Sequence, residues 1–176
     1  MYFIRVNGET GHNNPNNQDC FVPGEPPTYP RTAFNYFQLC LDQEFVRIGW
    51  PDVGDLRGEN GHEALTHCYR LPDLAPYKQR YLLRFAGIPK GSTILMPNIA
   101  QPGDLAIGTT SSKYYFLHNV PNDPYECAHR INVDWDRAVY HADQFDISIR
   151  GGLWRRAFYH IRDDHVIRKV RSARSQ

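Results

Sequence analysis

The chain has 176 residues, of which 41% are hydrophobic, and this length and composition fit one compact domain with a buried core. Its 20 Lys and Arg residues against 19 Asp and Glu residues exclude a uniformly basic nucleic-acid-binding surface. Positive charge is instead concentrated near the C-terminus, where eight Lys or Arg residues and two acids follow residue 149. Such a segment can be a solvated tail or a surface that contacts phosphates.

The N-terminal part predicts two strands separated by a loop and a helix. Tyr2–Val6 alternates bulky and polar side chains and stops at an Asn-Gly pair, as a strand does. The segment to about residue 31 is rich in Asn, Gly and Pro and predicts a long loop. Phe34–Asp42 predicts a short helix, and Phe45–Trp50 predicts a second strand.

The middle of the chain predicts two helices, Gly61–Tyr69 and Tyr77–Ala86, and the second should end at Gly87 as a C-cap. Several short strands then follow, namely Thr93–Met96, Leu105–Thr109, Tyr114–Asn119 and Ile131–Trp135. Short strands with helices inserted early predict an α+β fold with a strongly curved sheet or a small barrel.

The cysteines and the hydropathy pattern bear on compartment and metal binding. Cys20, Cys40, Cys68 and Cys127 are widely spaced without a Cys-x-x-Cys pair, so we expect buried thiols rather than a zinc knuckle or a dense disulfide framework. The chain shows neither a signal-peptide pattern nor an apolar run near the length of a membrane span. We therefore expect a cytoplasmic protein that holds no metal or cofactor.

The segment FVRIGW is the most informative one, because Trp50 stands at the end of a predicted strand. A tryptophan in that position can form one wall of a pocket for a flat ligand such as a nucleobase, where stacking contributes roughly 1–3 kcal/mol per base. It can also cap the core, with its indole N–H bonded to a carbonyl.

Three segments in this order resemble the EVE and YTH-like domains of the PUA superfamily, in particular the modified-base recognition domains of McrBC-type and other modification-dependent restriction systems. The first is Tyr2–Val6 together with FVRIGW, the second is RYLLRFAGIPKGSTILMP, and the third combines LAIGTTSSKYYF with HRINVDW. They span about Tyr2 to Trp135, so residues 1–150 are taken as the domain and residues 151–176 as a basic extension, packed on it or trailing from it.

The resemblance implies a small, strongly curved β-barrel flanked by helices, in which an aromatic cage holds a flipped nucleobase. Base flipping costs a few kcal/mol of stacking, which the cage and hydrogen bonds to the base edge must recover. A methyl or hydroxymethyl group would add roughly 1–3 kcal/mol of discrimination. The resemblance further implies binding to DNA more than to RNA, as the sensor of a defence system with a separate nuclease or NTPase effector chain.

The resemblance and the residue types nominate two sets of site residues. Nucleobase contacts are expected from Trp50, Tyr114, Tyr115, Phe116 and Trp135 by stacking, and from Asn7 and Asn35 by hydrogen bonds. Phosphate contacts are expected from His129, Arg130, Arg155, Arg156, Arg168 and Lys169. The alternatives are core packing for Trp135, turn or capping roles for the asparagines, and a cross-strand ion pair for His129 and Arg130.

Two other function classes stay open. One is an RNA-binding module of the same fold that acts in RNA modification or translation. The other is a small enzyme built on His67 and Cys68 or on Cys127 and His129, although neither pair has the spacing of a known metal site. We expect no intrinsic catalytic activity.

Overall fold

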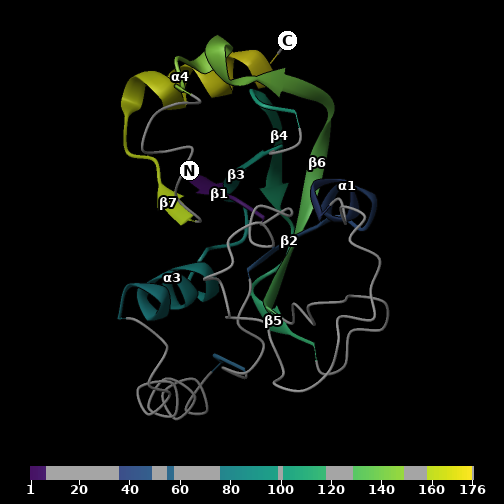
Figure 1. The fold of residues 1–176 in the computed structure, drawn as a ribbon, viewed down its shortest axis with the longest axis vertical. Helices are drawn as coiled ribbons and strands as arrows, with labels where there is room; N and C mark the ends of the chain where they lie inside the picture. The colour runs from purple at the N-terminus through teal and green to yellow at the C-terminus, as the bar shows by residue number, and fades with distance from the viewer. Residues whose placement is uncertain are drawn as a thin grey trace, which may run out of the picture.

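The computed structural model describes residues 1–6, 36–48, 55–57, 76–98, 101–117, 129–148 and 158–175 (Figure 1). The strands of this part of the chain are β1 (Tyr2–Ile4), β2 (Phe45–Ile48), β3 (Thr93–Pro97), β4 (Asp104–Thr110), β5 (Tyr115–Phe116), β6 (His129–His141) and β7 (Phe158–His160). Its helices are α1 (Tyr36–Asp42), α3 (Pro76–Ala86), the 3-10 helix η2 (Ala142–Phe145) and α4 (Asp164–Arg174).

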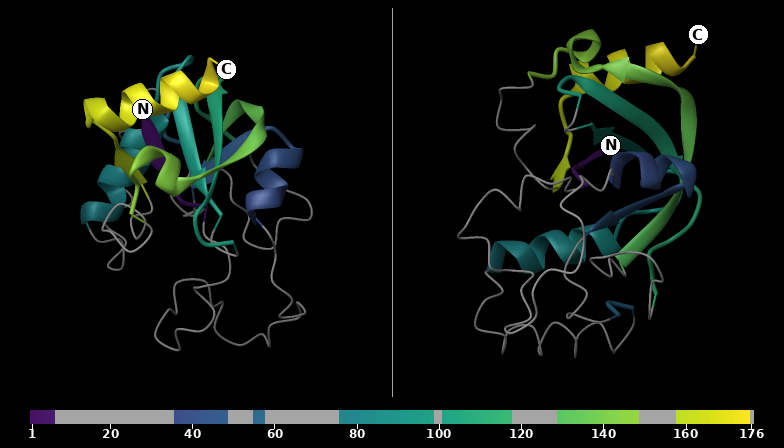
Figure 2. Two further views of the ribbon diagram at one scale, coloured as in Figure 1. Left: turned by 90° about the horizontal axis from the view of Figure 1, so that it is seen from above. Right: turned by 45° about the vertical axis from the view of Figure 1, so that its right-hand side comes forward.

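The strands form one mixed sheet in the order β2-β6-β4-β3-β1-β7, with β5 also paired to β6. β1 runs parallel to β3, and the other described pairs are antiparallel. The sheet curls into a half-barrel, which is clearest along β6 in the right-hand view of Figure 2. The predicted α+β class and the predicted strong curvature are therefore confirmed.

Strand β6 is the source of much of this curvature. Its first residues pair with β2 and β5, and its later residues pair with β4. Between the pairs Ala106↔Val139 and Gly108↔Trp135, one residue of β4 faces three residues of β6. Extra residues of this kind bend a strand and increase its twist. The bulge thus turns the second half of β6 away from the line of the first half.

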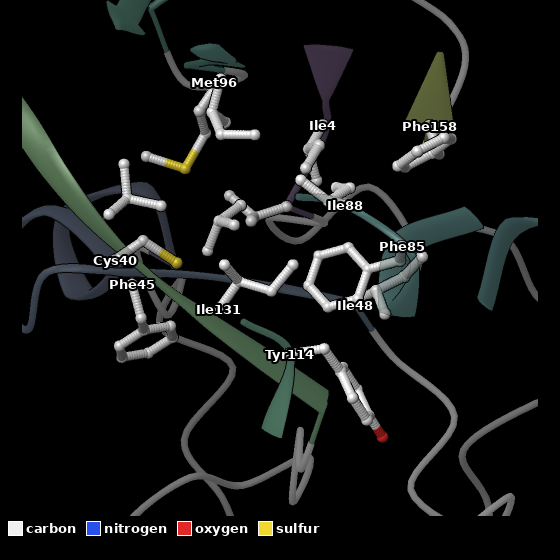
Figure 3. Close-up of a cluster of buried hydrophobic side chains, with 14 of the residues drawn as sticks. Ile4, Cys40, Phe45, Ile48, Phe85, Ile88, Met96, Tyr114, Ile131 and Phe158 are labelled. Atoms are coloured by element: carbon white, nitrogen blue, oxygen red, sulfur yellow. The ribbon is translucent and has the colours of Figure 1, made fainter. Parts of the chain in front are cut away.

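Hydrophobic side chains are buried on both faces of the sheet, so the strands separate two hydrophobic clusters. The first cluster lies between the sheet and the helices α1 and α3, and Figure 3 shows Phe85 and Ile88 there, facing the sheet residues Ile4 and Ile131. The second lies under η2 and α4. Alternation along the strands divides the two sets, as in β1, where Ile4 enters the first cluster and Phe3 the second.

The basic C-terminal extension is part of the same sheet and core. β7 pairs with β1, and Val166 and Val170 of α4 are buried in the second cluster. Of the two alternatives for residues 151–176, the described residues show the packed one. The carboxylate of Asp163 accepts a hydrogen bond from the His165 N–H (2.9 Å) and caps the start of α4.

Most predicted elements within the described residues are present with shifted ends. The strand predicted at Ile131–Trp135 extends over His129–His141, and the aromatic strand is limited to Tyr115–Phe116. α3 ends before Gly87, as predicted, but the glycines with positive φ are Gly91 and Gly103. The predicted loop after residue 6 and the predicted helix at 61–69 lie outside the described residues.

The described residues also bear on the expected buried thiols and on membrane-spanning helices. Cys40 is buried and is not part of a disulfide, and the other three cysteines lie outside the described residues. Within the ranges that the structure describes, no helix is long and apolar enough to cross a membrane.

The contact between β4 and β6 next to the bulge requires a glycine. A Cβ at Gly108 would lie 2.5 Å from Cγ1 of Val133 and 2.7 Å from Cε3 of Trp135. We predict that Gly108→Ala lowers the free energy of unfolding by about 1–3 kcal/mol, the usual cost of overpacking a core. Urea denaturation measures the change, and an unaltered midpoint would show that β4 and β6 are not in such close contact.

Candidate nucleic-acid interface

The aromatic segment predicted to contact a base lies at one end of the sheet, where β2, β5 and the beginning of β6 meet. We call this end of the sheet the aromatic end. There Phe116 and Ile48 flank His129 on its two sides, and Tyr115 pairs with Arg130. The structure thus brings Tyr114, Tyr115, Phe116, His129 and Arg130 together.

Tyr114 is an interior residue of the aromatic end. It is only 5% exposed, its ring stacks on His129, and its edge meets Phe85 (Figure 3). Its Oη accepts a hydrogen bond from the Leu56 N–H (3.2 Å) and lies 2.8 Å from Nδ1 of His129. Burial raises the pKa of Tyr114 to about 12. These contacts assign it to the core rather than to a base.

His129 and Arg130 are also buried. His129 is completely enclosed, and the guanidinium carbon of Arg130 lies 4.1 Å from the centre of the Phe45 ring, a cation–π contact. A phosphate would have to enter the interior to meet either side chain. Their burial therefore favours internal packing over the predicted phosphate contacts, and one contact of Arg130 is with an aromatic ring.

Tyr115 and Phe116 are half-buried, unlike Tyr114, and so keep part of their rings at the surface. Tyr115 Oη donates to Oδ1 of the exposed Asn132 (2.7 Å), and the Phe116 ring meets His129 edge-on at 5.0 Å. At the aromatic end, these two rings are the described aromatic side chains that are partly open to solvent.

Asn132 was not among the predicted site residues. The Asn132 N–H donates to Oγ of Ser112 (2.9 Å), and its carbonyl accepts from the Ser111 N–H (2.9 Å), so its backbone is fixed. Alternation could have identified it, because Asn132 is exposed between the buried Ile131 and Val133. An exposed amide beside a tyrosine ring has donors suited to a base edge.

Trp135 lies further along β6 and has a packing role. Its indole N–H donates to the Cys40 carbonyl of α1 (2.9 Å), and its ring packs against the first hydrophobic cluster. This arrangement matches the core alternative for Trp135. The bond fixes α1 against the sheet.

The predicted phosphate contacts on α4 lie at the other end of the molecule, as Figure 1 shows, with α4 at the top and β5 far below it. Lys169 Nζ and His165 Nε2 each lie 2.6 Å from Oδ2 of Asp146. Both hydrogen bonds lower the pKa of Asp146, and the one from Lys169 has the larger effect. Arg168 is exposed on the outer side of the helix. Lys169 thus forms an ion pair with Asp146 of the same chain at the surface, and Arg168 is exposed to solvent.

The C-terminal end of α4 is held by a second ion pair. Arg174 binds both carboxylate oxygens of Asp136 in the β6 bulge at 2.8 Å and also donates to Oγ1 of Thr109 (3.0 Å). Tyr140 Oη donates to the same carboxylate (3.2 Å). Bidentate pairs have well-defined geometry, so this contact fixes the helix to the bulge.

The remaining predicted site residues, Trp50, Asn7, Asn35, Arg155 and Arg156, lie outside the described residues. The same holds for His67, Cys68 and Cys127 of the enzyme alternative. In the part of the chain that is described, no group of three or more His, Cys, Asp or Glu side chains could hold a metal ion.

Comparison with known proteins adds no assignment: no family model, no curated protein and no solved structure matches the chain. What the aromatic end binds is therefore inferred from its own side chains and from the sequence resemblance.

We predict that Tyr114→Phe lowers the free energy of unfolding by about 1–3 kcal/mol, because the buried Leu56 N–H and the His129 ring lose a partner. Urea denaturation measures the loss, and Tyr115→Phe, which removes a hydrogen bond at the surface, is the matched control. Folding keeps Tyr114 protonated, so its contribution is present below pH 10 and is lost between pH 10 and 12. Equal effects of the two variants would contradict the interior role.

The ion pair between Asp146 and Lys169 of α4 gives a separate prediction. The pKa of Asp146 is lower in the folded protein than its ordinary value of 3.8, so its contribution to stability is present above that value and disappears as the pH falls through the lowered pKa. Asp146→Asn should reduce Tm at pH 7, and the difference from wild type should shrink progressively as the pH falls below 3.8. Asp143→Asn is the control. A difference that persists at low pH would exclude the ion pair as its cause.

Proposed function

We propose that the protein is a cytoplasmic nucleic-acid-binding domain of the PUA type that holds a modified base of DNA against the ring of Tyr115 or of Phe116. The observation that carries the proposal is the combination of two half-exposed aromatic rings with an exposed, backbone-fixed amide, Asn132, at one end of a strongly curved sheet.

Stacking supplies the affinity in this proposal. A base that covers one of the two rings gains roughly 1–3 kcal/mol, and this gain depends little on which base it is. The Phe116 ring rests against the buried His129, which stacks on Tyr114, and the Tyr115 hydroxyl is bonded to Asn132, so the two rings need little reordering when a base arrives.

Hydrogen bonding supplies the selectivity. Tyr115 Oη holds Oδ1 of Asn132, which leaves the amide NH₂ group of Asn132 to donate to a base edge. A methyl or hydroxymethyl group on the base would be sensed by its fit against the rings, which gives selective rather than absolute recognition.

The sequence resemblance extends this site. β2 ends at Ile48 beside His129, two residues before Trp50, the tryptophan that resembles the cage residue of EVE and YTH-like domains. Asn7 and Asn35 remain proposed contacts for the base edge. The domain acts without catalysis in this proposal and reports a modified strand to a separate effector chain of a defence system.

The test is binding to DNA and RNA oligonucleotides, with and without modified bases, measured by fluorescence anisotropy. We expect modified DNA to bind most tightly, and Trp50→Ala, Tyr115→Ala and Phe116→Ala each to weaken that binding about 5- to 150-fold, the equivalent of one stacked base. Tyr115→Phe keeps the ring and is the matched control, which should retain most of the stacking affinity.

Three results would contradict the proposal. Unchanged affinity of the folded alanine variants would exclude the aromatic end, and tighter binding to RNA would favour an RNA-binding module. Metal-dependent cleavage of the strand by the purified protein would favour the enzyme.

A further inference from the structure

A second surface of the molecule, formed by α3, β7 and α4, carries a row of basic side chains. We call it the basic edge, and it consists of Arg84, His160, Arg162, Arg168 and Arg171. The four arginines are exposed, and His160 is half-buried. These residues come from α3, from β7 and the segment after it, and from α4, which lie one below another along the left side of Figure 1.

Aromatic contacts place α3 beside β7. The Tyr81 ring lies 6.4 Å from the Phe158 ring, and the His160 ring stacks on Tyr2 at 4.8 Å. Arg84 follows Tyr81 by three residues and therefore lies on the same side of α3, toward β7. Arg162 follows His160 by two residues. β7 is the last strand in the sheet order, so this row borders the sheet.

The two ion pairs of α4 determine which of its basic residues are available. Lys169 is bound to Asp146 and Arg174 to Asp136, while Val166 and Val170 are buried. Arg168 and Arg171, three residues apart, lie side by side on the exposed surface of the helix. The pairs thus anchor the helix and leave these two arginines for another charge.

The charges along the basic edge are poorly balanced. Burial lowers the pKa of His160, and so do the positive charges of the Met1 amino group, Arg162 and Arg84, so the charge of the edge comes from its arginines. The nearest acids in sequence are Asp163 and Asp164 at the start of α4, and Asp163 is engaged in capping the helix. Grouped cations with few acids among them attract an anion from solution.

We propose that the basic edge binds the phosphodiester backbone of the nucleic acid whose base enters the aromatic end. This inference rests on the proposed function, and it assigns phosphate contacts to three residues that the sequence did not suggest, Arg84, His160 and Arg162. Backbone contacts carry no sequence information, so they add affinity for modified and unmodified strands alike.

The test compares single charge reversals in oligonucleotide binding across a range of salt concentrations. Arg84→Glu, Arg162→Glu and Arg171→Glu should each weaken binding about tenfold at low salt, equally for modified and unmodified DNA. Each should also lower the slope of log K against log salt by about one. The matched control is Arg137→Glu, which makes the same charge change at an exposed site on β6, four strands from β7 in the sheet order.

The outcomes separate this inference from the proposed function. If wild-type protein binds oligonucleotides and loses affinity in Tyr115→Ala, while the reversals behave like Arg137→Glu, the basic edge is not the phosphate contact. If wild-type protein binds no oligonucleotide, both proposals fail. Binding to vesicles of anionic lipid but not to oligonucleotides would identify a membrane surface as the partner and overturn the inference.

Discussion

The close contact between β4 and β6 is the constraint on which the rest of the structure depends. β6 extends through thirteen residues from the aromatic end to η2, and it bends at a bulge that lies beside Gly108. A side chain at residue 108 would collide with Val133 and Trp135, so the bend needs a glycine there. Without the bend, β6 could not pair with β2 and β5 at one end and lead into η2 under α4 at the other.

That geometry also separates the two surfaces to which we assign functions. The first half of β6 carries Asn132, which is bonded to Tyr115, and the buried His129, which the Phe116 ring meets. The bulge in its second half carries Asp136, which receives Arg174 and fixes α4. One strand thus positions the aromatic end directly and the α4 part of the basic edge through an ion pair. A nucleic acid that contacts both surfaces must extend along the molecule rather than bind at one point.

Local patterns in the sequence predicted the strands well where alternation is regular and buried residues are apolar, as in Thr93–Pro97 and Asp104–Thr110. They failed for β7 and α4, because Phe158–His160 is very short and α4 is rich in basic residues, which conceals the two buried valines. The packing of these elements depends on β1, more than 150 residues earlier in the chain. No local window contains that information.

The candidate site was predictable to a similar degree. Sequence identified the aromatic segment but not which ring is interior, because the position of Tyr114 depends on Phe85 and on the Leu56 N–H, 58 residues away. Trp135 was equally ambiguous until its hydrogen bond to the Cys40 carbonyl, 95 residues away, was known. Asn132 could have been found from alternation alone. It is the exposed polar residue between the buried Ile131 and Val133.

The distribution of acids explains how a chain with nearly balanced charge can present a basic surface. Asp146 and Asp136 are placed opposite Lys169 and Arg174, where they hold α4, and so they do not neutralise Arg168 and Arg171. The acids at the start of α4 face the positive end of the helix dipole, where negative charge is favourable. Counting charges over the C-terminal segment therefore overstates the number of basic residues open to a ligand, and it gives no sign of Arg84, which reaches the same edge from α3. Ion pairing within the fold, rather than composition, decides which cations can meet an anion from outside.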